Sequence, residues 1–102
     1  MHKVVLITGA AHRIGRETAK VFAEDGWNVI IHFNSSLKAA ADLAAEFNAK
    51  RSGSACIIQA DLDIDADVER LVSESKEAYG RMDALINNCL LYTSPSPRDP
   101  TS

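Results

Sequence analysis

A run of eight residues near the N-terminus combines two glycines with two basic side chains. It reads Thr8-Gly9-Ala10-Ala11-His12-Arg13-Ile14-Gly15 and follows an apolar run at 4–7. A strand that turns sharply into a helix needs positions without a Cβ, and the first N–H groups of that helix then face any anion lying there. The spacing differs from the common G-x-G-x-x-G pattern. The strand before it and the helix after it nevertheless predict a pyrophosphate-binding turn; the alternative is a plain tight turn.

Apolar runs alternate with segments of helical period along the chain, which indicates strands and helices in alternation. The expected strands are 4–7, 29–33, 55–60 and 84–87. Such an order requires a parallel sheet with right-handed crossovers, and it places the glycine turn at the carboxyl edge, beside a switch point where ligands bind.

Each of the three intervening helices has its own predicted buried stripe. These stripes are Ile14, Thr18, Val21 and Phe22; Ala40, Leu43, Ala44 and Phe47; and Val68, Leu71, Val72, Ser75 and Tyr79. The first helix is expected to end near 25–26. Ser36 and Asp63 are the expected N-caps of the second and third helices, and Gly80 ends the third.

Composition excludes several classes of function. The 102 residues are 46% hydrophobic and 25% charged with a net charge of −3, which does not favour a nucleic-acid or membrane partner. Without a membrane-spanning run or a signal cleavage site, a cytoplasmic location is expected. Cys56 and Cys89 lack C-x-x-C spacing, and the scattered histidines give no metal site. At this size the chain is one small domain, below the usual size of a nucleotide-dependent enzyme.

The composition changes after Asn88. Residues 89–102 contain three prolines, show no periodicity and precede no helix. The stretch from Cys89 to Asp99 resembles the conceptual translation of a transposase adapter used in short-read DNA libraries. We expect residues 1–88 to be native and 89–102 to be a non-native segment; the alternative is a genuine disordered tail.

Three motifs in order resemble the short-chain dehydrogenase/reductase family: the Thr-Gly turn, Ala60-Asp61-Leu62 and Ile86-Asn87-Asn88. The resemblance covers residues 3–88 and implies the N-terminal part of a Rossmann-type α/β fold, a doubly wound parallel sheet of which about four strands and three helices are present. It implies that Asp61 meets the adenine amino group with Leu62 beside the ring, and that Asn87 supports the strands on the cofactor side. A turn or cap aspartate is the alternative for Asp61.

Arg13 stands where most family members carry a glycine. This arginine, with 31–36 and 48–55, is similar to the pteridine reductase branch, in which it lies over the phosphates and reaches the pterin. A guanidinium at a helix N-terminus opposes the helix dipole unless an anion lies between them. The alternative is an exposed helix residue facing water.

The residues after the second strand indicate which nicotinamide cofactor is bound. An acidic residue there would favour NAD, whereas this chain has Asn34, Ser35 and Ser36 with Lys38 close by. Hydroxyl donors without a carboxylate favour NADP(H). Helix capping is the alternative role for both serines.

The resemblance further implies hydride transfer assisted by a Tyr-x-x-x-Lys pair, which this chain lacks: Tyr79 is followed by Asp83 and Tyr92 by Ser96. We therefore expect no catalytic residue here and an inactive chain. The expected parent is an NADPH-dependent pteridine reductase; a 3-oxoacyl or general carbonyl reductase and a non-enzymatic NADP sensor remain open. A small pterin-like substrate and a homotetramer are the implied partners. His12, His32, Cys56 and Trp27 are expected to be solvent-facing or packing residues.

Overall fold

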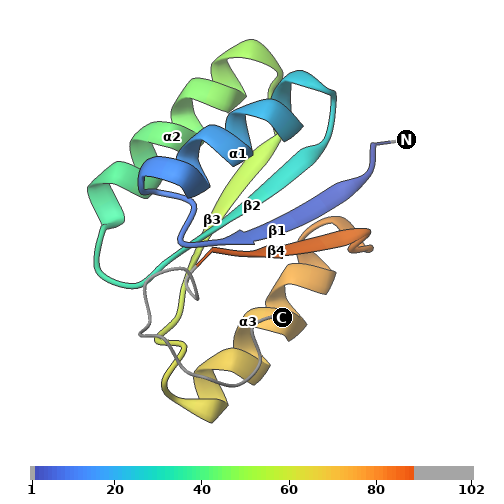
Figure 1. The fold of residues 1–102 in the computed structure, drawn as a ribbon. Coiled ribbons are helices and arrows are strands. Elements are labelled where there is room, and N and C mark those ends of the chain that lie inside the picture. The colour runs from blue at the N-terminus through green and yellow to red at the C-terminus, as the bar shows by residue number, and fades with distance from the viewer. Residues whose placement is uncertain (1, 89–102) are drawn as a thin grey trace, which may run out of the picture.

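Strands and helices alternate throughout the computed structural model, which describes residues 2–88 (Figure 1). The elements are β1 (Val4–Thr8), α1 (Arg13–Glu24), β2 (Asn28–Phe33), α2 (Leu37–Lys50), β3 (Ala55–Gln59), α3 (Asp65–Tyr79) and β4 (Ala84–Asn87). The four predicted strands and three predicted helices are confirmed. The prediction of a non-native segment at 89–102 lies outside the described residues.

The four strands form one parallel sheet in the order β3-β2-β1-β4. The chain builds outward from β1 through β2 to β3 and then returns to pair β4 with the other side of β1. In register, Leu6 lies between Ile30 and Leu85. The reversal of direction beside β1 creates the predicted switch point, and the carboxyl ends of all four strands reach the same edge of the sheet.

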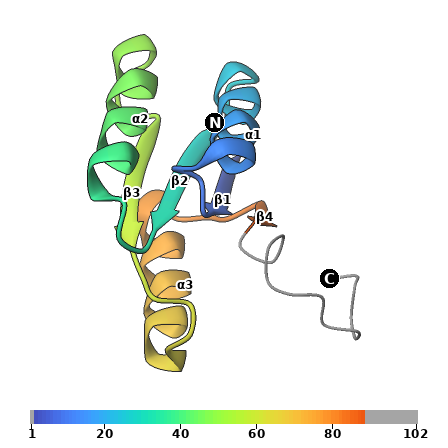
Figure 2. The same ribbon diagram turned by 60° about the vertical axis from the view of Figure 1, so that its left-hand side comes forward.

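Helices cover both faces of the sheet. α1 and α2 lie side by side on one face and α3 lies on the other, as two views show (Figures 1 and 2). Side-chain alternation divides β1 between two cores: Val5 and Ile7 pack with α1 and α2, whereas Val4 and Leu6 pack on the side of Leu71 in α3. Burial on both faces explains why the strands are continuous apolar runs.

The predicted buried stripe is confirmed for α2 and only in part for α1, where Phe22 packs against the core as predicted. All four residues predicted for α2 are buried. In α1, Ile14 and Val21 are 62% and 66% exposed, and the buried residues are Gly15 and Ala19. Gly15 and Ala19 face the sheet because α1 packs close to the turn that precedes it. This orientation leaves Ile14 and Val21 on the outside, while Phe22 still packs against the core.

The predicted caps need two corrections. Ile64, and not Asp63, is the N-cap residue of α3, because the backbone N–H of Asp63 bonds Asp61 Oδ1 in a turn just before the helix. Ser36 is the N-cap residue of α2, but its hydroxyl makes no capping hydrogen bond. None of the helices between residues 2 and 88 is long and apolar enough to cross a membrane.

Candidate functional site

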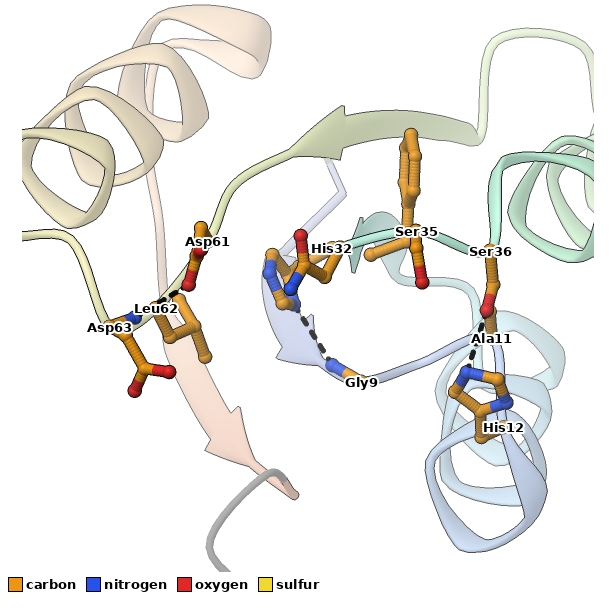
Figure 3. Close-up of a pocket in the computed structure, with 11 residues that line it drawn as sticks. Gly9, Ala11, His12, His32, Ser35, Ser36, Asp61, Leu62 and Asp63 are labelled. Atoms are coloured by element: carbon orange, nitrogen blue, oxygen red, sulfur yellow. Dashed lines mark hydrogen bonds between the residues drawn. The ribbon is translucent and has the colours of Figure 1, made fainter.

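A cavity of about 300 Å³ lies at the carboxyl edge of the sheet (Figure 3). The loops that follow β1, β2 and β3 all contribute to its wall. Its lining residues are Gly9, Ala11, His12, His32, Phe33, Asn34, Ser35, Ser36, Asp61, Leu62 and Asp63. The predicted site residues Gly9, Asn34, Ser35, Ser36, Asp61 and Leu62 are therefore brought together, although they come from three separate segments.

The glycine turn after β1 is held against the sheet and the first turn of α1. Gly9 has a φ of 63°, in the left-handed region that glycine adopts without strain. A Cβ built on Gly15 would overlap the Gly9 carbonyl oxygen. The glycine at position 15 therefore permits the close approach, and the N–H groups of the first helical turn have no partner within the helix.

The first turn of α1 is suited to an anion. It contains no acidic residue and no side chain caps it, so the positive end of the helix dipole is not neutralised locally. The backbone N–H of Ala10 bonds the His32 carbonyl at 3.3 Å and that of His12 bonds the Gly9 carbonyl at 3.3 Å. The N–H groups of Ala10 and His12 are therefore used within the molecule, and an anionic ligand would meet the N–H groups of the first turn of α1.

The loop after β2 carries polar side chains without a carboxylate. The Ser36 hydroxyl lies 2.9 Å from His12 Nε2, which joins the N-terminal ends of α2 and α1 across the cavity wall (Figure 3). Gln59 Nε2 donates to the Asn34 main-chain oxygen at 3.2 Å. Lys38 does not line the cavity; its ammonium pairs with Asp42 at 3.3 Å. His12 is thus the basic group nearest to Ser36 in this wall.

The loop after β3 is shaped by carboxylates. Asp61 Oδ1 accepts the backbone N–H of Asp63 at 2.9 Å, and the backbone N–H of Asp61 donates to Asp67 Oδ2 at 2.9 Å. The turn role that the sequence allowed for Asp61 is therefore observed. A carboxylate has two oxygens, so a turn that uses one of them is compatible with a ligand contact through the other.

Thr8 and Asn87 do not line the cavity but contact each other. The Thr8 hydroxyl donates to Asn87 Oδ1 at 2.8 Å and accepts the backbone N–H of Asn88 at 3.0 Å. Thr8 is buried. The pair therefore ties the carboxyl ends of β1 and β4 together at the switch point.

Five predicted site residues are not among those that line the cavity: Thr8, Arg13, Ile14, Gly15 and Asn87. Arg13 and Ile14 line a separate open depression on the outer side of α1, together with Arg16, Glu17, Thr18 and Val21. Arg13 is exposed and its φ is +31°. Its contact with cofactor phosphates stays a prediction, since the cavity described above does not include it.

His32 is the main residue that the sequence interpretation left out of the site. It is 2% exposed, lines the cavity, and both of its ring nitrogens bond main-chain groups. Burial lowers the pKa of its imidazole, and the hydrogen bond to the Ala60 carbonyl opposes this shift. Its position at the end of an apolar strand that reaches the carboxyl edge was the available signal.

No catalytic constellation accompanies the cavity within residues 2–88. Tyr79 donates its hydroxyl hydrogen to the Gly53 carbonyl at 3.0 Å. Gly53 precedes β3, so this bond lies at the edge of the sheet opposite to the cavity. Burial raises the pKa of Tyr79 to about 12, which does not suit proton transfer near neutral pH. The same residues hold no cluster of potential metal ligands.

A parallel doubly wound sheet with a glycine turn and a cavity at its switch point defines a Rossmann-like α/β domain. The sequence profile of the short chain dehydrogenases matches residues 3–98. The chain belongs to the short-chain dehydrogenase/reductase family, as its motifs predicted.

Three relatives show the range within the family. The chain is 38% identical over 90 residues to an uncharacterized oxidoreductase of Methylorubrum extorquens, covering 88% of this chain and 36% of that protein. It is 34% identical over 95 residues to a short chain dehydrogenase/reductase of Aspergillus oryzae (93% and 36%). It is 35% identical over 111 residues to pteridine reductase 1 of Leishmania tarentolae (92% and 38%). The chain thus spans little more than a third of the length of these relatives.

Proposed function

We propose that residues 1–88 form the NADP(H)-binding N-terminal part of a larger oxidoreductase. The observation that carries this proposal is the loop after β2, where Asn34, Ser35 and Ser36 bring no carboxylate to the cavity and the Ser36 hydroxyl bonds His12. Hydroxyl donors beside a basic ring suit a ribose 2′-phosphate, whereas an acidic residue would repel it. Family membership supports a nicotinamide cofactor in general.

Each loop of the cavity has a distinct role in this proposal. The first turn of α1 meets the pyrophosphate, and Gly15 permits the approach by leaving room for the Gly9 carbonyl. Asp61 accepts from the adenine amino group and Leu62 covers the ring. Arg13 extends the anion site outside the cavity, and Thr8 with Asn87 keeps the ends of β1 and β4 together.

The chemistry that the bound cofactor would supply is transfer of a hydride to a small-molecule substrate. We propose a pterin or folate ring as that substrate, which the arginine at position 13 and the likeness to a pteridine reductase support. A general carbonyl or 3-oxoacyl reductase is the second candidate, because other relatives carry different reductase names, such as hydroxynaphthalene reductase-like protein. The whole protein is proposed to be a cytoplasmic homotetramer.

Cofactor binding is tested by titrating the purified 102-residue chain with NADP⁺ and NAD⁺ in a calorimeter. We expect NADP⁺ to bind about tenfold more tightly. Ser35→Asp places a carboxylate beside the 2′-phosphate position, and we expect it to weaken NADP⁺ binding at least about tenfold while sparing NAD⁺. Ser52→Asp, an exposed serine between α2 and β3, is the matched control. Equal affinity for both cofactors in the unmodified chain would contradict the proposal.

The absence of catalysis is tested separately. We expect no NADPH oxidation by this chain with dihydropterin or quinonoid substrates, because residues 1–88 contain no Tyr-x-x-x-Lys pair. Measurable turnover would overturn this expectation.

Resequencing the locus across the Asn88 codon tests the proposed boundary at residue 88. A reading frame that replaces 89–102 and encodes Tyr-x-x-x-Lys supports an enzyme; one without this pair supports an NADP-binding sensor. A native frame through the present codons would refute a non-native segment.

A further inference from the structure

The imidazole of His32 joins three segments of the sheet. Its Nδ1 lies 3.0 Å from the backbone nitrogen of Gly9 (Figure 3). Its Nε2 lies 2.9 Å from the carbonyl oxygen of Ala60. Gly9 follows β1, Ala60 follows β3, and His32 lies in β2 between them. A single buried ring therefore bonds the glycine turn on one side and the start of the Asp61 loop on the other.

The partners of this ring determine where its proton lies. A backbone N–H can only donate, so Nδ1 must accept from Gly9 and carries no hydrogen. A carbonyl oxygen can only accept, so Nε2 must donate to Ala60. The structure thus selects the neutral Nε2–H tautomer, and a doubly protonated ring would set an Nδ1–H against the Gly9 N–H.

We propose that His32 is a positioning residue of the cofactor cavity, and that its neutral Nε2–H form holds the Gly9 turn in the conformation that accepts a dinucleotide. This inference rests on the NADP(H)-binding function proposed above. His32 also accepts the Ala10 N–H through its main-chain carbonyl. Ring and backbone together engage two consecutive N–H groups of the turn, and the anion is directed to the first turn of α1.

If the neutral ring of His32 holds the turn, dinucleotide binding should weaken in acid. Other titratable groups surround the ring: His12 in the turn, Asp61 and Asp63 in the β3–α3 loop, and Asp67 and Arg70 of α3, which bond the main chain of Asp61 and Gln59. Burial lowers the pKa of His32 from its ordinary 6.5. As the pH is lowered, His32 therefore takes up its proton in the unfolded chain before it does so in the folded chain. The contribution of neutral His32 to folding stability is complete above pH 6.5 and is lost as the pH falls through the lower folded pKa.

The ring contact is tested by nuclear magnetic resonance on the 102-residue chain without cofactor. A long-range ¹H–¹⁵N spectrum of the imidazoles is expected to show His32 as the single Nε2–H tautomer, with a pKa below its ordinary 6.5. In His32→Phe, which keeps a ring but removes both nitrogens, we expect Gly9 amide exchange to accelerate about tenfold. An Nδ1–H tautomer, or an unchanged Gly9 amide, would overturn the proposal.

Binding is tested by NADP⁺ titration of the same variants. We expect His32→Phe to weaken binding about tenfold and His32→Gln, which keeps one donor and one acceptor, to restore part of it. His2→Phe is the matched control, because exposed His2 also bonds a main-chain oxygen, that of Gly26, at the other end of the sheet. If His32→Phe unfolds the chain, its amide spectrum will show this, and NADP⁺ binding by His32→Gln then tests the proposal in its place.

The pH profile separates positioning from a merely structural role. Measured in a His12→Gln background, which removes the other imidazole of the cavity, NADP⁺ affinity should fall as His32 takes up its proton. With His32→Phe added, affinity should be low and independent of pH over that range. A profile unaltered by His32→Phe would overturn the proposal. If the unmodified chain binds neither NADP⁺ nor NAD⁺, the proposed function fails and this inference with it, whereas binding without dependence on His32 refutes the inference alone.

Discussion

Arg13 combines an unfavourable backbone conformation with an unfavourable electrostatic position. It is the single non-glycine residue with positive φ between residues 2 and 88, and it lies in the position that begins α1. A left-handed conformation costs an L-residue roughly 1–2 kcal/mol, and a cation at a helix N-terminus adds to that cost. An arginine at a position with both of these energetic costs fits the interpretation that its guanidinium binds a ligand.

Arg13→Gly is expected to stabilise the chain while weakening NADP⁺ binding. The variant relieves the backbone strain, but the greater conformational freedom of glycine in the unfolded chain offsets about 0.5–1 kcal/mol of this stabilisation. The net gain should be about 0.5–1 kcal/mol, measured by urea unfolding followed through Trp27 fluorescence. Calorimetric titration with NADP⁺ measures the loss of affinity.

Arg16→Gly supplies the control for this experiment. Arg16 is exposed on the same helix and lacks the positive φ, so its replacement should destabilise the chain by about 1 kcal/mol. If both glycine variants lose stability, the strain assigned to Arg13 is refuted.

At the scale of elements, the sequence predicted the buried face of α2 fully and that of α1 only in part, for a physical reason. Apolar periodicity reports which face of a helix avoids water, and in α2 that face meets the sheet at ordinary side-chain distance. In α1 the contact is so close that Gly15 and Ala19 form it, and Ile14 and Val21 remain outside. Close backbone approach selects small residues, which a hydrophobic pattern does not register.

Gly15→Ala tests this close approach. In an ordinary helix, replacing glycine by alanine stabilises by about 1 kcal/mol. Here the new methyl group would overlap the Gly9 carbonyl, so we expect a loss of about 1–3 kcal/mol in urea unfolding. Glu17→Ala, on the exposed side of α1, should change stability by less than about 0.5 kcal/mol. A stabilised Gly15→Ala variant would show that the turn yields without cost.

Tyr79 anchors the end of α3 to the loop before β3. Its hydroxyl bonds the Gly53 carbonyl, and burial raises its pKa from 10.0 to about 12. Because the folded pKa is the higher one, this stabilisation is complete below pH 10 and is lost as the pH rises toward 12. We expect the free energy of unfolding of Tyr79→Phe, measured by urea titration, to fall less steeply with rising pH above 10 than that of the unmodified chain. An equally steep fall in the variant would assign the loss of stability to other groups.

The candidate site was predictable in outline and not in its connections. Parallel strand order alone places the ends of β1, β2 and β3 at one edge of the sheet. The sequence therefore predicted that Gly9, Ser36 and Asp61 lie close together, and all three line the cavity. The contacts of His32 and His12 depend on where neighbouring loops come to rest. Such tertiary contacts have no fixed spacing in the chain, and no local pattern encodes them.

On the scale of the whole molecule, apolar surface is unevenly covered within residues 2–88. β4 pairs with β1 on one side only, and Leu85 in that edge strand is 55% exposed. An edge strand with apolar side chains is a site of association between chains. We expect the 102-residue chain to self-associate as its concentration rises, with light scattering after gel filtration as the measurement.

Leu85→Lys is expected to raise the concentration needed for self-association about tenfold, because a lysine on an edge strand disfavours pairing with another chain. Leu37→Lys is the matched control: Leu37 is 56% exposed but begins α2, away from the unpaired edge. An equal effect of the two lysines would mean that net charge, and not the edge of the sheet, governs association. A selective effect of Leu85→Lys would identify the outer side of β4 as the surface on which a further strand adds to this sheet.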